Sequence, residues 1–180
     1  MFHPIKHFLV VHRHRKLVFR HCRMAGIPLQ GLLHDLSKYS PQEFIPGAHY
    51  YLGYKSPNVR EREVKGYSAA WMHHKGRNKH HFEYWVDYQI ASRRSGPVKM
   101  PDRYVIEMFC DRVAASKVYQ GDNYTDQKPL EYFETGFAKN FMHPETARVL
   151  ETWLKMLARD GEVKTFAYIR ANRKHVYKRQ

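Results

Sequence analysis

Cysteine, long apolar runs and secretion signals are scarce or missing in this 180-residue sequence. Cys22 and Cys110 alone cannot build a disulfide framework, which favours a reducing cytoplasm. No run of about 18 apolar residues occurs, so we expect no membrane-spanning helix. The opening residues, MFHPIKHFLVVHRHRKL, mix apolar residues with histidine and arginine and lack the small-residue cleavage site of a secretory signal. We therefore expect a soluble, cytoplasmic protein without a membrane partner.

Acidic residues are also few, which leaves a strongly basic chain. The chain has 17 aspartates and glutamates against 31 lysines and arginines, which gives a formal net charge of +14. Such a charge favours a polyanionic partner, either nucleic acid or a phosphorylated small molecule. A solvated surface accounts for part of it, because basic residues cluster in the segments HRHRKLVFRHCR and IRANRKHVYKR. Charge alone therefore selects no ligand.

The alternating apolar and polar residues of half-buried strands are nearly absent. Hydrophobic residues still make up 43% of the chain, enough to bury one sizeable core. The breaks between apolar-periodic segments have the length of turns, and no linker or internal repeat separates two parts. We predict an all-α, single-domain helical bundle over residues 1–180.

Proline, glycine and capping residues mark the predicted helix boundaries. A first helix lies between Pro4 and Gly26, and a short second helix from Pro28 includes His34 and Asp35. Ser40 and Glu43 in SPQEF match a capping box and predict another helix start. Further helices are expected over VREREVKGYSAAWMHH, over HFEYWVDYQIASR after a KGRNK loop, in a long segment after Pro101, and about three times beyond Pro129, one of them starting at Pro144.

Two polar residues fall on faces that helical periodicity predicts to be buried. At 3.6 residues per turn, His14 lies in the middle of the apolar stripe of the first helix. By the same periodicity, Asp111 faces the core from the long helix after Pro101. A buried unpaired carboxylate costs several kcal/mol, so it must be protonated, paired or bound to a metal. We expect the partner of Asp111 to come from another helix.

The adjacent pair His34 and Asp35 completes a set of candidate ligands. Neighbouring residues on a helix differ in direction by about 100°, and both can touch one ion that lies at the edge between them. Neutral imidazoles and carboxylate oxygens suit a divalent transition metal such as Mn, Fe, Ni or Zn. His14, His34, Asp35 and Asp111 therefore predict a metal site.

The ordered pattern of His14, the HD dipeptide at His34 and Asp35, and Asp111 resembles the HD-domain superfamily of metal-dependent phosphohydrolases. Lys38 makes the stretch HDLSK similar to the His-Asp-x-x-Lys form of its cyclic-dinucleotide phosphodiesterase branch. That branch has paired histidines that supply a second metal, at a place where this chain has His73 and His74, so the resemblance implies one or two ions. The resemblance covers roughly residues 10–120 and implies an all-helical fold. We place the metal-site core at about residues 5–120 and, from the helical pattern beyond Pro129, a helical extension at about 129–178.

The chain departs from that branch after the paired histidines. Lys75 and GRNKHH stand where the branch continues with an acidic residue and a Gly-Tyr-Pro signature, so cyclic-dinucleotide specificity does not carry over. His49 matches only loosely the further single histidine of that pattern. As a whole, the chain also resembles a small bacterial family of unknown function with HDLSK, SPQEF and HHKGRNKHH blocks, and this second likeness implies no activity.

Hydrolysis of a phosphate ester, of a nucleotide or related small molecule, is the function that the resemblance favours. A bound metal would lower the pKa of its water and polarise a phosphoryl oxygen. Asp35 would anchor the metal, and Lys38 would neutralise charge that develops on the phosphoryl group. The expected substrate-binding residues follow the paired histidines: Arg77, Lys79, His80 and His81. For His80 and His81 we expect contact with substrate or with ligands rather than direct ligation.

Two other functions stay open. Iron in the same helical His/Asp set can activate oxygen, and the HD-like fold includes di-iron oxygenases. Alternatively, the chain is a basic nucleic-acid-binding module with structural histidines, which explains the net charge of +14 but leaves the inward Asp111 unexplained. Bound iron would favour the first, and steeply salt-dependent binding of DNA or RNA that ignores chelators would favour the second.

Overall fold

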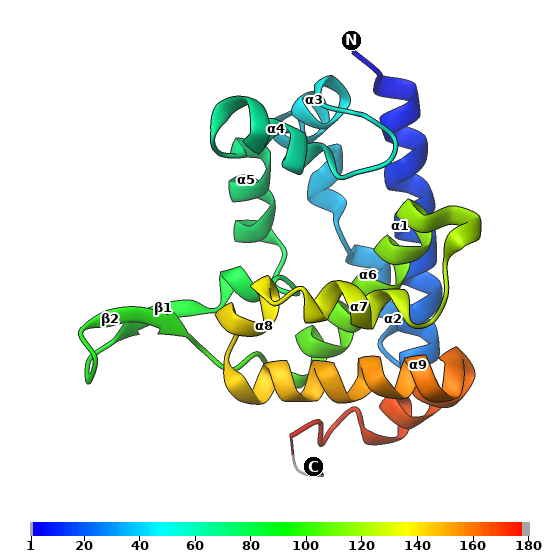
Figure 1. Ribbon diagram of the computed structural model, residues 1–180, viewed down its shortest axis with the longest axis vertical. Coiled ribbons are helices and arrows are strands. Elements are labelled where there is room, and N and C mark those ends of the chain that lie inside the picture. The colour runs from blue at the N-terminus through cyan, green and yellow to red at the C-terminus, as the bar shows by residue number, and fades with distance from the viewer. Residues whose placement is uncertain (1, 178–180) are drawn as a thin grey trace.

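The computed structural model describes residues 2–177, which form a mostly helical domain as the sequence predicts (Figure 1). Nine α-helices occur among these residues: α1 (Pro4–Ala25), α2 (Pro28–Leu33), α3 (Pro41–His49), α4 (Pro57–Lys65), α5 (Ala69–Arg77), α6 (Asp102–Gln120), α7 (Lys128–Glu134), α8 (Phe137–Phe141) and α9 (Pro144–Asn172). Short 3-10 turns cover Leu36–Tyr39, Phe82–Tyr84 and Gly121–Asn123, and the strands are β1 (Val86–Gln89) and β2 (Arg94–Pro97). None of the described helices combines the length and apolarity that crossing a membrane requires.

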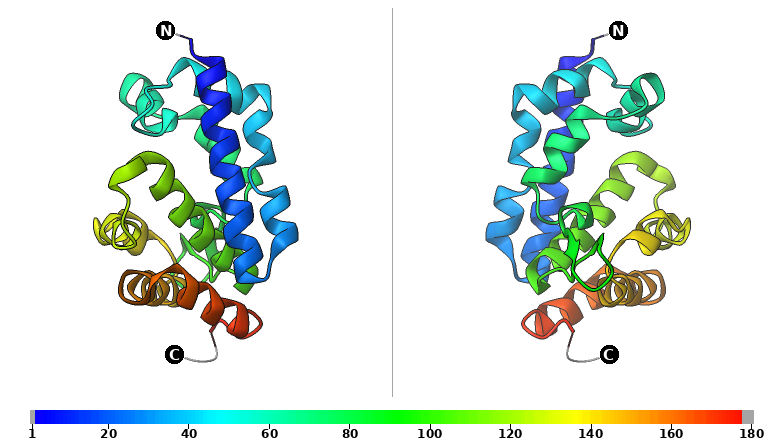
Figure 2. Two further views of the ribbon diagram at one scale, coloured as in Figure 1. Left: turned by 90° about the vertical axis from the view of Figure 1, so that its right-hand side faces the viewer. Right: turned by 90° about the vertical axis from the view of Figure 1, so that its left-hand side faces the viewer.

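Helix α1 is the long element against which α2, α3, α6 and α9 pack (Figure 2). It begins at Pro4 and ends where Gly26 adopts a left-handed conformation (φ 82°), both as predicted. Its buried stripe contains Val11, His14, Val18 and Cys22. The apolar periodicity therefore places His14 in the interior, as the sequence predicts.

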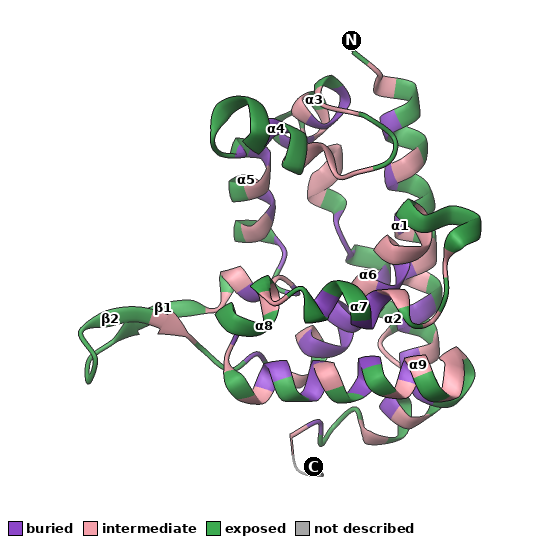
Figure 3. Cartoon of the chain, viewed as in Figure 1, coloured by how far each residue is buried: buried purple, intermediate pink, exposed green. Residues whose placement is uncertain are grey.

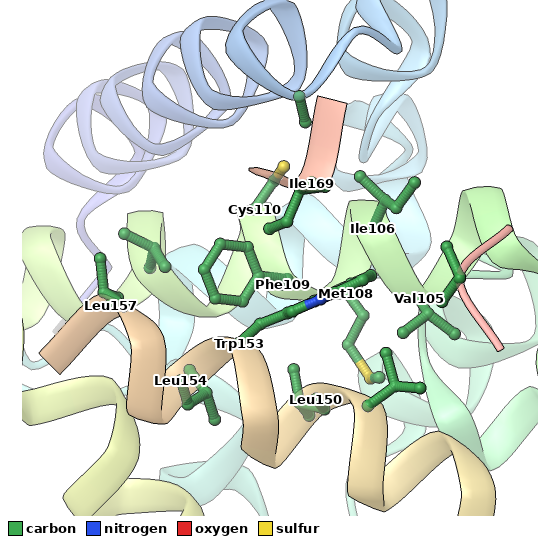
Figure 4. Close-up of a cluster of buried hydrophobic side chains, with 14 of the residues drawn as sticks. Val105, Ile106, Met108, Phe109, Cys110, Leu150, Trp153, Leu154, Leu157 and Ile169 are labelled. Atoms are coloured by element: carbon green, nitrogen blue, oxygen red, sulfur yellow. The ribbon is translucent and has the colours of Figure 1, made fainter. Parts of the chain in front are cut away.

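The hydrophobic core lies mainly between α6 and α9 (Figure 4). The Phe109 ring on α6 meets the rings of Trp153 and Phe166 edge-on, with centroids 5.9 and 5.5 Å apart. Buried residues also occur on α1 and α7, so the core extends to those helices (Figure 3). This core holds α6 in a fixed position against α1, so it also fixes the distance between the polar residues of those two helices.

The prediction of a helix over HFEYWVDYQIASR is wrong, because β1 and β2 form an antiparallel hairpin there. All four residues of β1 are exposed, and the hairpin projects from the helical body (Figure 3). Arg93 at its turn has φ 53°, a left-handed conformation that a helix does not contain. Because β1 buries none of its residues, the geometry of the turn determines the conformation of this segment more than its helical propensity does.

Two helix boundaries also differ from the prediction. The single helix expected over VREREVKGYSAAWMHH is two helices, α4 and α5, because Gly66 ends α4 in a left-handed conformation (φ 80°). Helix α3 begins after Ser40 as predicted, yet the Ser40 side chain makes no capping hydrogen bond. Glu43 does not complete a capping box, since its carboxylate binds two histidines of α5 instead. Helix α5 also runs on to Arg77, into the predicted KGRNK loop.

Candidate metal centre

The first group of candidate ligands joins α1 to α6. His14 on α1 has its Nε2 atom 3.0 Å from Oδ1 of Asp111 on α6. His34 contributes an Nε2 atom 3.2 Å from Oδ2 of Asp35 and 3.7 Å from Oδ1 of Asp111. His14, His34, Asp35 and Asp111 thus offer four ligand atoms within 4.8 Å of one another. The inward-facing carboxylate of Asp111 meets partners from other elements, as expected.

His34 and Asp35 do not lie on a helix, which corrects the prediction for the segment after Pro28. Helix α2 ends at Leu33, His34 follows in an extended conformation, and Asp35 is left-handed with φ 54°. Aspartate tolerates this conformation better than most residues do. The Arg15 guanidinium holds the reversal by donating to the carbonyl oxygens of Leu32 and His34, at 2.9 and 2.8 Å. The turn, rather than a helix edge, directs both side chains into one cluster.

A second group of candidate ligands forms on the other side of Asp35. Nε2 of His74 on α5 lies 3.3 Å from Oδ1 of Asp35, and Nε2 of His80 lies 3.5 Å from the same oxygen. The His81 ring is close by, with its centroid 4.1 Å from that of His80 and 4.8 Å from that of His74. Asp35, His74, His80 and His81 form a second set with ligand atoms within 4.8 Å. The structure therefore places His80 and His81 among candidate ligands, nearer than the sequence predicts.

Asp35 belongs to both groups and lies between them. Its Oδ2 atom faces His14 and His34, whereas its Oδ1 atom faces His74 and His80. The side chain is 1% exposed, and Nζ of Lys38 lies 2.7 Å from Oδ2. One carboxylate can therefore contact two ions, with a lysine cation at its edge.

Two glutamates that sequence reasoning missed hold the imidazoles in place. Oε1 of Glu107 on α6 accepts from Nδ1 of His34 at 3.0 Å and from Nδ1 of His80 at 3.2 Å. Glu43 on α3 accepts from Nδ1 of His73 and of His74, both at 2.7 Å. Because an ionised carboxylate only accepts hydrogen bonds, each Nδ1 carries a proton, which leaves Nε2 as the atom that can bind a metal once it is unprotonated. Oriented in this way, His34, His74 and His80 direct Nε2 towards Asp35.

The charges of the cluster are strongly coupled. Burial would raise the pKa of Asp35, but His34 and Lys38 outweigh it and hold that pKa well below its ordinary value. Burial would likewise lower the pKa of His34, yet Asp35, Asp111 and Glu107 raise it well above the ordinary range. Protons thus balance the buried carboxylates in the metal-free protein. A metal ion that binds here displaces protons, so its affinity rises with pH.

A second observation, independent of the distances, also fits a metal: several of the candidate ligand atoms are buried without a hydrogen-bond partner. Nε2 of His14, His34, His80 and His81 and Oδ1 of Asp35 are buried and make no hydrogen bond with the described residues. Such atoms are costly unless something binds them. Ligands about 2.1 Å from one ion lie about 3.0–3.4 Å apart. Nε2 of His14 lies 3.0 Å from Oδ1 of Asp111 in the first group, and Nε2 of His74 lies 3.3 Å from Oδ1 of Asp35 in the second. Imidazoles and carboxylates together suit a divalent transition metal.

Other predicted site residues lie outside both groups. His73 binds Glu43 and is not among the candidate ligands. Arg77 and Lys79 are exposed, and the Lys79 ammonium lies 5.5 Å from the Tyr84 ring centroid. His49 is exposed on α3, beside Tyr50. The structure therefore brings together eight of the predicted residues: His14, His34, Asp35, Lys38, His74, His80, His81 and Asp111.

A family of unknown function, DUF5662, matches residues 3–156 of the chain. The chain belongs to this family. All residues of both ligand groups lie within the matched region, so the candidate centre is part of the DUF5662 region itself. Neither the curated proteins nor the solved structures contain a significant match to the chain. The family match therefore assigns no activity to the centre.

Proposed function

We propose that this protein is a metal-dependent phosphohydrolase that cleaves a phosphate ester of a small molecule, such as a nucleotide. The observation that carries the proposal is the pair of ligand groups that share Asp35, with the Lys38 ammonium 2.7 Å from its carboxylate. The order of His14, His34–Asp35 and Asp111 along the chain supports it through the resemblance to HD-domain phosphohydrolases. Metal ions in such a centre lower the pKa of bound water and polarise a phosphoryl oxygen.

The residues of the chain have separate tasks in this proposal. His14, His34 and Asp111 would hold one ion, His74, His80 and His81 would hold the other, and Asp35 would contribute to both sites. Lys38 keeps its positive charge, because burial, which would lower its pKa, is outweighed by Asp35 and Asp111. A fixed cation at this place stabilises negative charge on a transferring phosphoryl group. Glu107 and Glu43 keep the imidazoles oriented.

The proposal is tested by phosphate release from a panel of nucleotides and sugar phosphates. The untagged protein is loaded with Mn²⁺, and Asp35→Asn and Lys38→Met are compared with wild type. We expect metal-dependent release that Asp35→Asn abolishes and that Lys38→Met lowers about 10²–10³-fold. Lys6→Met removes an exposed lysine on α1 and should retain wild-type activity. Release that survives a chelator, or that Lys38→Met leaves unchanged, would contradict the proposal.

A di-iron oxygenase is the second candidate, favoured by the three imidazoles of the second group. In that case the purified protein contains iron, shows an absorption band in the visible range, and consumes oxygen with a reduced substrate. Iron content together with oxygen uptake, without phosphate release, would favour the oxygenase over the hydrolase. A basic nucleic-acid-binding module is distinguished by chelator-independent binding of DNA that weakens steeply with salt.

A further inference from the structure

A groove on the molecular surface lies between α1 and the C-terminal end of α6, with the turn that follows α6. Its volume is about 640 Å³, and none of the residues that line it belongs to either ligand group. The packing of α6 against α1 brings the two walls of the groove together (Figure 2). Clefts that bind small organic molecules typically measure about 300–1,000 Å³. The groove therefore has the size of a small-molecule site, and the proposed function leaves it unused.

The groove is lined by cations, and no acidic side chain of the described chain lines it. Arg13 and Lys16 stand three residues apart on one face of α1, both are exposed, and neither makes an ion pair or a side-chain hydrogen bond with residues 2–177. Lys117 contributes a further ammonium from α6. Glu162 pairs with it, and it lies 5.2 Å from the centroid of the Tyr124 ring. The unpaired charges of Arg13 and Lys16 favour an anionic ligand.

The rest of the groove wall is largely apolar. Leu9 and Leu17 lie four residues before and after Arg13, on the same face of α1. Tyr124 lines the groove from the connection between α6 and α7, and its hydroxyl donates to Oδ1 of Asp126 at 2.9 Å. Because this hydrogen bond already uses the hydroxyl, the tyrosine offers a ligand the apolar surface of its ring. Aromatic and aliphatic side chains of this kind bind the planar base of a nucleotide.

We propose that this groove is a binding site for a nucleoside polyphosphate, separate from the metal centre. Arg13 and Lys16 hold the phosphate groups, because a guanidinium matches two phosphate oxygens and an ammonium adds a second positive charge. The base lies against Tyr124, Leu9 and Leu17. A second copy of the chain is a poorer occupant, since it carries the same net charge of +14 and is repelled. The inference goes beyond the proposed phosphohydrolase function and does not depend on it.

Binding of a fluorescent N-methylanthraniloyl nucleoside triphosphate to the metal-free full chain tests this inference. A chelator in the buffer removes any contribution of metal ions. We expect saturable binding, which the double variant of Arg13→Gln and Lys16→Gln weakens about 10- to 100-fold. The double variant of Arg148→Gln and Lys164→Gln makes the same charge change at two exposed residues of α9 that have no ion pair in the described chain. This matched control should retain wild-type affinity.

Inorganic tripolyphosphate, which has no base, separates the phosphate contacts from the base contacts. Tyr124→Leu should weaken nucleotide binding about tenfold and leave tripolyphosphate binding unchanged, as measured by titration calorimetry. Tyr124→Phe keeps the ring and should bind nucleotide as wild type does. The double variant of Arg13 and Lys16 should weaken the binding of both ligands, because it removes the phosphate contacts that they share.

Several outcomes would overturn the inference. Wild-type nucleotide affinity in the double variant of Arg13 and Lys16, or an equal loss in the α9 control, would show that the groove does not hold the phosphates. A single-stranded oligonucleotide that binds about tenfold more tightly than the nucleotide would assign the surface to a nucleic-acid strand instead. If Tyr124→Leu does not fold, as judged by circular dichroism, the double variant and its control decide.

The same measurements separate this inference from the proposed function. Nucleotide binding that depends on Arg13 and Lys16, without metal-dependent phosphate release from any ester, would support the inference while the proposed function fails. Metal-dependent phosphate release by a protein whose metal-free form binds no nucleotide would do the reverse.

Discussion

Glu107→Gln is the substitution that most informatively perturbs the centre. One oxygen of Glu107 accepts from His34 at 3.0 Å and from His80 at 3.2 Å, and these two histidines belong to different ligand groups. Burial would raise the pKa of Glu107, but the hydrogen bonds from the two histidines lower it to about 2, so the acceptor is ionised. The other oxygen accepts from Nε2 of Gln30 at 2.8 Å.

An amide at this position removes the negative charge and replaces one acceptor by a donor. Its NH₂ group would face the Gln30 NH₂ group or a histidine N–H, and either arrangement leaves a donor unsatisfied. Loss of such an outer partner typically costs 10–100-fold in metal affinity, about 1.4–2.7 kcal/mol. Because His34 and His80 serve different groups, we expect this loss at both metal positions.

Competition with a fluorescent chelator measures the two metal affinities in wild type and Glu107→Gln. Glu63→Gln is the matched control, since Glu63 is exposed and pairs with Lys55 and Arg60 away from the centre. Affinities in Glu107→Gln within about twofold of wild type at both positions would refute the reasoning, because outer partners of metal ligands normally matter more than this. A loss at one position only would show that Glu107 orients a single imidazole.

Three further predictions follow from named contacts. Glu43→Gln should weaken metal binding by about tenfold at the second group alone, because Glu43 binds His74 and touches no ligand of the first group; the same chelator competition checks this. Gly31→Ala should lower the free energy of unfolding by about 1–3 kcal/mol, since a Cβ there would lie 2.6 Å from Cys22 Cβ. Gly76→Ala, whose Cβ meets no described atom within 4 Å, should be neutral or stabilising in the same urea unfolding experiment. Burial and the charge of Lys38 lower the pKa of His7 from 6.5 to about 4, so as the pH falls the unfolded chain is protonated at His7 before the folded chain is. The free energy of unfolding of the metal-free protein should therefore decrease as the pH falls from about 6.5 to about 4, and it should decrease less in His7→Gln.

Helices with strong local signals could be predicted from the sequence. Pro4, Pro101 and Pro144 mark the starts of α1, α6 and α9, and Gly26 marks the end of α1. Proline restricts its own backbone and glycine permits a left-handed one, so no distant contact is needed to interpret either signal. The apolar stripe of α1 predicted the burial of His14 for the same reason.

The rest of the candidate site depended on chain reversals that local signals do not specify. His34 and Asp35 reach the cluster through a left-handed turn held by Arg15, which is remote in sequence. Glu43 matches a capping box but binds histidines of α5 instead, because the tertiary partner is stronger. Glu107 stands among buried apolar residues of α6, and its role depends on which imidazoles face it. Periodicity cannot show such partners.

The metal content of untagged, reconstituted protein, measured by elemental mass spectrometry, tests the central claim most directly. The shared position of Asp35 predicts two transition-metal ions per chain in wild type, with both lost in Asp35→Ala. Asp111→Ala should lose only the ion of the first group, and Glu63→Ala should lose neither. Wild-type protein that binds no metal, or Asp35→Ala that retains the wild-type content, would contradict the account.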